Sequence, residues 1–277
     1  MRSIYIFLWI AVLGISGCNL FSPFHSEGEH SDPDVLRDDA EAALAREDPE
    51  QALQYLDKAL EQKPDDPDLL YLHAVAVVDQ HDMDLSLFLD AFQKNGVTAL
   101  LEGSEAELGD LLETFWQVGR DLSPLVDGLS SGTLTIEEVP QVDDVLLSYS
   151  LAQILTGLLL ILDEDHTPPQ FTPDPRIQID KVGSAYQVHV EDPGQTDQEI
   201  DHEVDALITA QWPRFMEGRQ GLWLYYQWVR SGVPPHRADP LPELPAPLSV
   251  DFDDSPAGII LSTVDQGLRA LWEEMQD

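Results

Sequence analysis

The segment VDDVLLSYSLAQILTGLLLIL, from Val142 to Leu162, limits the possible folds of this chain more than any other stretch. So much apolar surface must be buried, either by protein or by lipid. Gln153 and Thr156 within it, aspartates near both ends and the lack of a basic flank favour a buried core helix. Insertion into a membrane and a face covered by a partner are the alternatives.

Acidic residues dominate the composition. The 277 residues include 52 acidic and 14 basic ones, for a formal net charge of -38, and the apolar fraction of 43% suits a folded protein. So negative a surface repels nucleic acid, and we expect no nucleic-acid partner. Because salt screens self-repulsion, a salt-rich, halophilic setting is one interpretation, and an ordinary acidic extracytoplasmic protein is the other.

The N-terminal segment has the features of a signal peptide. Arg2 precedes an apolar stretch, residues 4–15, that is too short to span a bilayer comfortably but suits a signal-peptide core. The tetrapeptide Ile15-Ser16-Gly17-Cys18 follows and contains the only cysteine of the chain. These four residues resemble the lipobox of bacterial lipoproteins. An incidental cysteine at the end of a signal anchor is the alternative.

The lipoprotein resemblance implies a processing order and a location. It implies that residues 1–17 are a cleaved signal peptide and that Cys18 is acylated with palmitate-type chains, which together anchor firmly. Asn19 stands where an aspartate favours retention at the inner membrane, so the periplasmic face of the outer membrane is favoured. Residues 18–32 lack an apolar period, and we expect a flexible tether there.

Residues 33–95 carry a helical pattern that repeats. Residues 34–46 and 50–62 are typical of two helices, and Pro64 ends the second. Small and apolar residues stand at the spacings of a tetratricopeptide repeat at Leu36, Ala40, Ala52, Leu56, Ala59 and Pro64. One repeat length further on, Leu70, Ala74 and Val77 occupy the first-helix positions again.

This region therefore resembles tetratricopeptide repeats, with departures. Asp39 and Ala43 stand where larger apolar residues are usual, and the register fails at Ser86 and Asp90. The resemblance implies helical hairpins and a concave surface for a protein partner. A generic helical hairpin is the alternative, and fold alone is weak support for a function.

We expect residues 96–277 to form a helical domain packed on these hairpins, so the chain is mainly α-helical. The predicted helices are 105–120, 142–162, 196–212 and a C-terminal one from Ser255, with a loop or short helices over 122–140. Alternating residues predict one β-hairpin over 176–190. The proline-rich stretch 234–247 is expected to be extended.

One segment combines large aromatic residues with arginines in this acidic chain. Arg219, Trp223, Tyr226 and Arg230 are the candidate binding surface, since flat rings and forked donors suit a peptide or a glycan. The alternative is that the aromatic residues pack the core and the arginines neutralise nearby carboxylates.

Sequence motifs give no support to catalysis, a cofactor or a metal. Residues 163–166 are acidic, but consecutive acids followed by prolines lack the alternation and the glycine of a calcium loop. His202 and Glu203 begin a zinc-protease pattern that fails at Ala206, where the second histidine is required. We therefore expect no enzyme, no cofactor and no metal site.

The sequence thus favours a lipid-anchored, non-catalytic interaction or assembly module of the bacterial cell envelope, with a protein partner. The alternative is an extracytoplasmic, transporter-associated solute-binding component with a helical pocket. An enclosed pocket lined by Arg219, Trp223 and Tyr226 would favour that alternative.

Overall fold

The fold is mainly α-helical, as expected. The computed structural model describes residues 32–81, 105–164, 168, 170–174, 176–182, 185–190 and 197–240. The predicted signal peptide and Cys18, the failing repeat register at Ser86 and Asp90, and the C-terminal helix from Ser255 all lie outside these residues.

The first part of the described chain holds α2 (Pro33–Leu44), α3 (Pro49–Leu60) and α4 (Pro67–Gln80), here called the N-terminal unit. Each helix begins with the same dipeptide, Asp-Pro. The aspartate side chain, at Asp32, Asp48 or Asp66, accepts a hydrogen bond from a backbone N–H of the first turn. At the first position of a helix the backbone N–H has no partner within the helix, so proline, which lacks this group, is favoured there. Each of the three helices therefore begins at its proline.

Small side chains form the core of the N-terminal unit. Ala40, Ala43, Ala52 and Ala59 are fully buried between α2 and α3, together with Leu56. Alanine lets two helix backbones approach closely. Ala43, which departs from the repeat pattern by being small, is among these buried residues.

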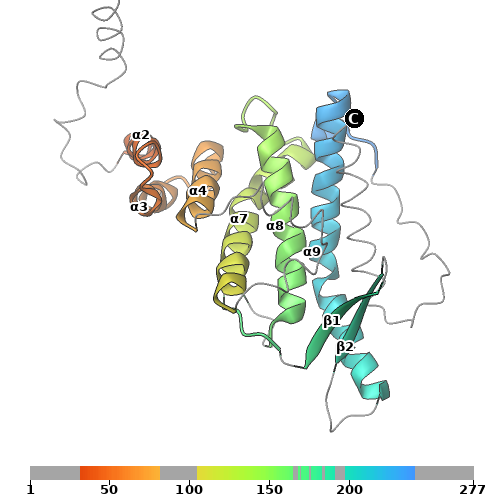
Figure 1. Ribbon diagram of the computed structural model, residues 1–277. Helices are drawn as coiled ribbons and strands as arrows, with labels where there is room; N and C mark the ends of the chain where they lie inside the picture. The colour runs from red at the N-terminus through yellow and green to blue at the C-terminus, as the bar shows by residue number, and fades with distance from the viewer. Residues whose placement is uncertain are drawn as a thin grey trace, which may run out of the picture.

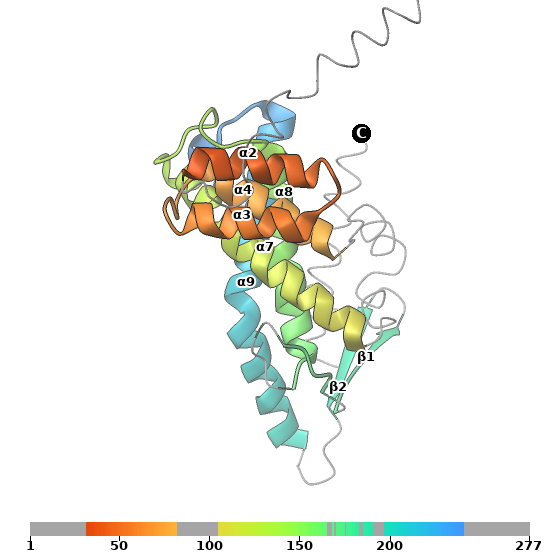
Figure 2. The same cartoon turned by 90° about the vertical axis from the view of Figure 1, so that its left-hand side faces the viewer.

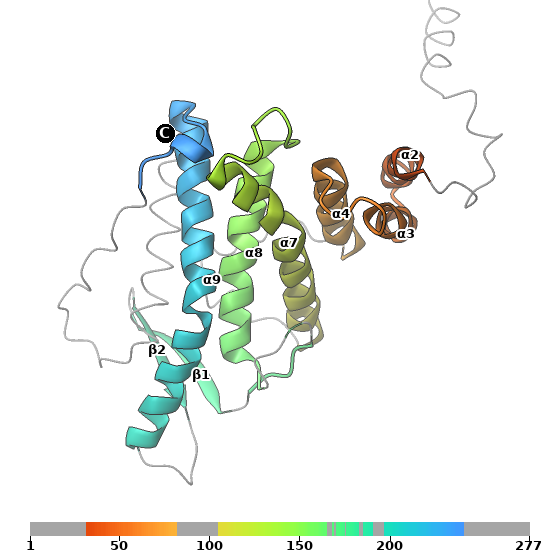
Figure 3. The same ribbon diagram turned by 180° about the vertical axis from the view of Figure 1, so that it is seen from behind.

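The second part holds α7 (Glu105–Ser131), α8 (Val142–Leu162) and α9 (Asp197–Ser231), here called the C-terminal bundle. α8 packs against both α7 and α9, and its direction is opposite to theirs (Figure 1). From behind, the order α9, α8, α7, α4 and then α2 with α3 is plain (Figure 3). Helices α2 and α3 run across the long axis of the bundle (Figure 2).

Two predicted helix ends are wrong, and both involve a proline. The loop expected from residue 122 begins only after Ser131, because α7 continues through Pro124 and buries Leu122, Leu125 and Leu129. Likewise α9 continues through Pro213 instead of ending at residue 212. A proline inside a helix removes one hydrogen bond and adds a clash. The apolar face that continues beyond each proline offsets this cost.

The most apolar segment forms α8, with the predicted bounds. Among the described helices, α8 alone is long and apolar enough to cross a membrane, and 89% of its apolar window is buried inside the protein. Leu155, Leu158 and Leu159 are among the most deeply buried side chains. α8 is thus the central helix of the bundle.

Two strands and one short helix complete the described chain. β1 (Ile177–Val182) pairs antiparallel with β2 (Ala185–Val190), with Ile177 opposite Val190. After α9, the predicted extended stretch contains a short 3-10 helix, η2 (Pro235–Arg237), which packs against α7 and α9. Residues 241–247 of that stretch lie outside the described residues.

Candidate functional site

The predicted aromatic and arginine surface lies on the second half of α9. Trp223 and Tyr226 stack with ring centroids 5.6 Å apart, and both are half-buried. The indole Nε1 of Trp223 donates a hydrogen bond of 2.8 Å to the backbone oxygen of Asp239. Trp223 therefore fastens the chain that follows α9 back onto the helix.

Two further residues of α9, Phe215 and Arg219, also lie within packed surroundings. Phe215 is buried and packs closely on Gly157 of α8. Arg219 is half-buried, and this burial lowers the pKa of its guanidinium. Arg230 lies near the end of α9. Contacts within the protein thus account for the positions of Phe215 and Trp223. This agrees with the alternative in which the aromatic residues of this segment pack the core.

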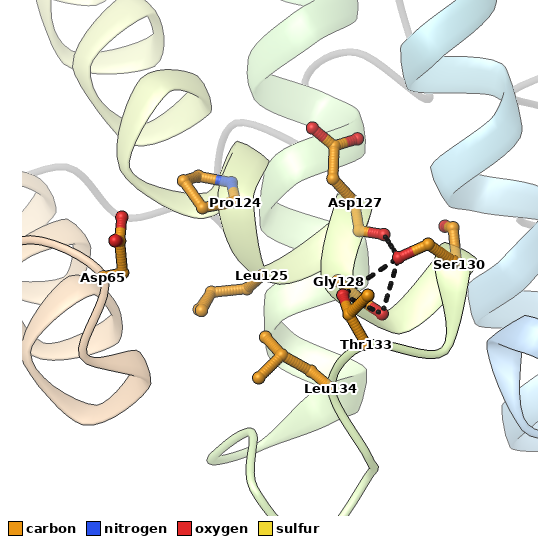
Figure 4. Close-up of a pocket in the computed structure, with 9 residues that line it drawn as sticks. Asp65, Pro124, Leu125, Asp127, Gly128, Ser130, Thr133 and Leu134 are labelled. Carbon is orange, nitrogen blue, oxygen red and sulfur yellow. Dashed lines mark hydrogen bonds between the residues drawn. The ribbon is translucent and has the colours of Figure 1, made fainter.

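An open groove lies elsewhere, where the two parts of the molecule meet. It has a volume of about 730 Å³ and lies between the turn that joins α3 to α4 and the end of α7 (Figure 4). We call it the junction groove. It is lined by Asp65 from the turn and by Pro124, Leu125, Asp127, Gly128, Ser130, Ser131, Thr133 and Leu134 from α7 and its following loop.

The loop after α7 shapes this groove by folding back on the helix. The backbone N–H of Leu134 donates to the carbonyl oxygen of Gly128 at 3.0 Å. A Cβ on residue 128 would lie only 2.6 Å from Cδ1 of Leu134, so glycine is needed for this approach. Ser131 turns its hydroxyl inward and donates to the carbonyl oxygen of Asp127 at 2.8 Å.

The lining of the junction groove is acidic and apolar. Asp65 and Asp127 are exposed, Leu125 and Leu134 are apolar, and the lining contains no lysine or arginine. Asp65 stands across the groove from Pro124 and Leu125 (Figure 4). The arrangement offers carboxylate acceptors above an apolar surface.

An ion-pair cluster around the buried His73 joins three helices. His73 of α4 is 7% exposed, and its Nδ1 lies 2.7 Å from Oδ2 of Asp121 on α7. Its Nε2 lies 3.3 Å from Oδ1 of Asp57 on α3. Asp121 also accepts hydrogen bonds from Nε2 of Gln117 and lies 3.8 Å from Nε of Arg120.

Burial lowers the pKa of His73, but the hydrogen bond and charge of Asp121, joined by Asp57, outweigh it and raise this pKa above its ordinary value. The raised pKa favours the imidazolium form of the ring. A general base needs a nitrogen free to accept a proton, whereas each nitrogen of His73 faces a carboxylate. The cluster thus suits a structural joint.

A second polar contact joins the N-terminal unit to the bundle. The hydroxyl of Tyr71 on α4 donates to Oδ2 of Asp144 on α8 at 3.4 Å. Burial, followed by the nearby charge of Asp144, raises the pKa of Tyr71 to about 12, so the phenol stays a neutral donor.

In the acidic loop after α8, the first carboxylate, that of Asp163, forms a hydrogen bond within the protein. Asp163 is fully buried, and its Oδ1 accepts a hydrogen bond of 2.7 Å from the backbone N–H of Thr172. Residues 165–167 lie outside the described residues. Among the residues that the structure describes, no three histidine, cysteine or acidic side chains are grouped to hold a metal ion.

Sequence reasoning missed both the junction groove and the His73 cluster. The available clue was the position of His73 inside the apolar helical run LLYLHAVAVV. A polar residue on a buried helix face needs a hydrogen-bond partner that is also buried. The groove depends on a loop that folds back onto α7, which no local pattern encodes.

No family model, curated protein or solved structure matches the chain.

Proposed function

We propose that the protein is a lipid-anchored, non-catalytic binding module of the bacterial cell envelope, and that its junction groove takes a basic segment of a protein partner. The observation that carries the proposal is the groove itself, which has carboxylates and apolar side chains and no cation in its lining.

The chemistry of the groove favours lysine or arginine side chains. Their methylene stems cover apolar surface while the charged head stays hydrated. Such a stem fits over the apolar surface of Pro124 and Leu134, and the head reaches Asp65 or Asp127. The formal net charge of -38 adds attraction at longer range and speeds the encounter with a basic partner.

We further propose that α2, α3 and α4 belong to a tetratricopeptide-like array. The support is that Ala40, Ala52 and Ala59, which stand at repeat positions, are fully buried in the N-terminal unit. Leu70 and Ala74, at the repeated positions of α4, pack instead toward the bundle. In such an array the bundle takes the place of a further repeat and completes the core.

The solute-binding alternative has less support. It requires a pocket at Arg219, Trp223 and Tyr226, whereas the indole N–H of Trp223 is bonded to Asp239 and its ring is stacked on Tyr226. The non-catalytic part of the proposal has limited structural support: the buried His73 is not placed as a general base, because each of its ring nitrogens faces a carboxylate.

The test of the groove is a titration with a defined probe, a short peptide of alternating lysine and alanine. Asp65→Asn combined with Asp127→Asn should weaken binding about tenfold, because each ion pair contributes about 0.5–1 kcal/mol. The matched control is Glu50→Gln combined with Asp79→Asn, which removes the same charge from exposed sites outside the lining. Equal weakening by both double variants would show general charge attraction and overturn the groove proposal.

The anchor is tested separately through its cysteine. Cys18→Ser should leave the precursor unlipidated and unprocessed, because the hydroxyl does not replace the thiol in acylation. Metabolic labelling with a palmitate analogue and membrane fractionation measure this. Normal maturation and membrane partition of the variant would contradict the anchor proposal.

A further inference from the structure

The His73 cluster is the strongest feature that the proposed function leaves unused. It is formed by one residue from each of α3, α4 and α7, namely Asp57, His73 and Asp121. Arg120, beside Asp121, is the other charged group of the cluster. The side chains of His73 and Asp121 are 8% and 6% exposed, whereas that of Asp57 is 69% exposed.

The geometry favours the protonated form of the histidine. Two carboxylates face the two ring nitrogens, and only the imidazolium has an N–H on both. A neutral ring can donate to one carboxylate and must turn a lone pair toward the other. Loss of the proton also leaves the buried charge of Asp121 with Arg120 as its one cationic neighbour in the cluster, and an uncompensated buried charge is strongly destabilising.

The cluster lies where the two parts of the molecule are joined. α4 contributes Leu69 and Ala76 to the core of the N-terminal unit and Leu70, Ala74 and Val77 to the core of the bundle. Besides the apolar contacts of this shared helix, two polar contacts join the two parts, the His73–Asp121 pair and the Tyr71–Asp144 hydrogen bond.

The cluster is also close to the junction groove along the chain. Pro124 and Leu125 of the groove follow Asp121 by about one turn of α7. Asp65, on the other wall, belongs to the turn between the two helices that carry Asp57 and His73. Any shift of α4 against α7 therefore moves the two walls of the groove relative to each other.

We propose that His73 is a pH-dependent latch between the N-terminal unit and the C-terminal bundle, closed when the ring is protonated and released when the proton leaves. The effect of this latch on the junction groove rests on the proposed function. Release of the latch separates the groove walls and so weakens the binding of a basic partner segment.

The direction of the pH effect follows from the raised pKa of His73 in the folded protein. A group with a raised folded pKa stabilises fully below its unfolded pKa, about 6.5 for histidine. That stabilisation is lost as the pH rises through the folded value. The latch is thus closed in mildly acidic solution and opens toward alkaline pH.

The test measures amide hydrogen exchange in α4 and α7 of the full chain at pH 6, 7.5 and 9, corrected for intrinsic exchange rates and without any partner. In the natural protein, protection at the α4–α7 contact should fall at least about threefold between pH 6 and 9. His73→Gln should show the low protection at every pH. His81→Gln, at the C-cap of α4, should follow the natural protein.

A direct titration keeps the proposal testable if His73→Gln does not fold. The NMR signal of the His73 ring in the natural protein should titrate above the ordinary histidine range, and Asp57→Asn should move its midpoint to lower pH. Protection that does not change with pH, or a His73 ring that is neutral at pH 6, would overturn the latch.

The lysine–alanine peptide then separates this inference from the proposed function. Weaker peptide binding at pH 9 than at pH 6, with the pH dependence abolished by His73→Gln, supports the control of the groove. A normal change in protection with no peptide binding at any pH overturns the groove and leaves the latch standing. Peptide binding with constant protection overturns the latch alone.

Discussion

The N-terminal unit and the C-terminal bundle are both built of packed helices, but they bury different side chains. The unit packs short helices through alanines such as Ala40, Ala52 and Ala59, whereas the bundle packs long helices through leucines along α8. Alanine gives close approach but little buried area, so the short helices gain less stability from their own core. We therefore expect the unit to be the less stable of the two parts and to gain stability from the docking of α4 on α7.

Charge is also distributed differently in the two parts. In the N-terminal unit, Arg37 lies 3.5 Å from Asp68, and Lys63 lies 2.8 Å from Asp34, so scarce cations link α2 to α4 and to the turn before it. In the bundle, Arg120 pairs with its sequence neighbour Asp121 at 3.8 Å, and Arg214 donates to the side chain of Gln153 at 3.4 Å. Surface pairs contribute little stability, so the buried core of the unit and its joint with α7 are its main supports.

The largest expected effect separates the two cores. Leu155→Ala, in the middle of α8, should lower the free energy of unfolding of the bundle by about 3–4 kcal/mol, because it removes a side chain that is 1% exposed. Leu56→Ala, between α2 and α3, should increase hydrogen exchange mainly in the N-terminal unit. Urea unfolding and exchange mapping measure both. Equal loss of protection across both parts would mean that they unfold as one.

The next effect concerns the close contact of α8 with α9. Gly218→Ala should cost about 2 kcal/mol of unfolding free energy, because a Cβ there would lie 2.6 Å from Ile154 Cγ1 and 2.8 Å from the backbone oxygen of Ser150. Gly109→Ala is the control, since its Cβ would meet only Phe171 at an ordinary 3.8 Å. If the two variants had the same stability in urea, the close packing would be refuted.

A smaller effect on stability, but a specific one on binding, is expected at the groove. Gly128→Ala should displace Leu134 from α7, because the added Cβ would lie 2.6 Å from Leu134 Cδ1. This displacement should weaken the binding of the lysine–alanine peptide. Peptide titration together with circular dichroism measures this. Unchanged affinity in a folded variant would show that the Leu134 surface takes no part in binding.

The smallest effect tests the second polar link between the two parts. Tyr71→Phe removes the 3.4 Å hydrogen bond to Asp144 and should cost about 0.5 kcal/mol, because that contact is long and partly exposed. Thermal unfolding near neutral pH gives the value. A loss as large as that of Leu155→Ala would make Tyr71, and not His73, the main polar support of the joint.

The helices were predictable where local signals agree with packing. Asp-Pro starts, apolar spacing and the long apolar run of α8 each act over a few residues, so α2, α3, α4 and α8 follow from the sequence nearly as they stand. The ends of α7 and α9 did not, because burial beyond Pro124 and Pro213 overrides the local cost of proline.

The site was far less predictable than the fold. The pairing of His73 with Asp121 and the position of Asp65 opposite Pro124 arise from how α4 docks on α7, which is a long-range contact. Conversely, the aromatic and arginine segment attracted attention by composition, and the structure gives Phe215 and Trp223 packing roles. Composition identifies unusual residues, but contacts decide what they do.

Photo-crosslinking tests the central claim, that the seam between the two parts is the partner site. A lysine–alanine peptide with a benzophenone group is irradiated with the full chain, and mass spectrometry locates the crosslinks. We predict crosslinks in the α3–α4 turn around Asp65 and in residues 124–134, lost with Asp65→Asn combined with Asp127→Asn. Crosslinks concentrated on α9 around Trp223, or spread evenly over the acidic surface, would contradict the account.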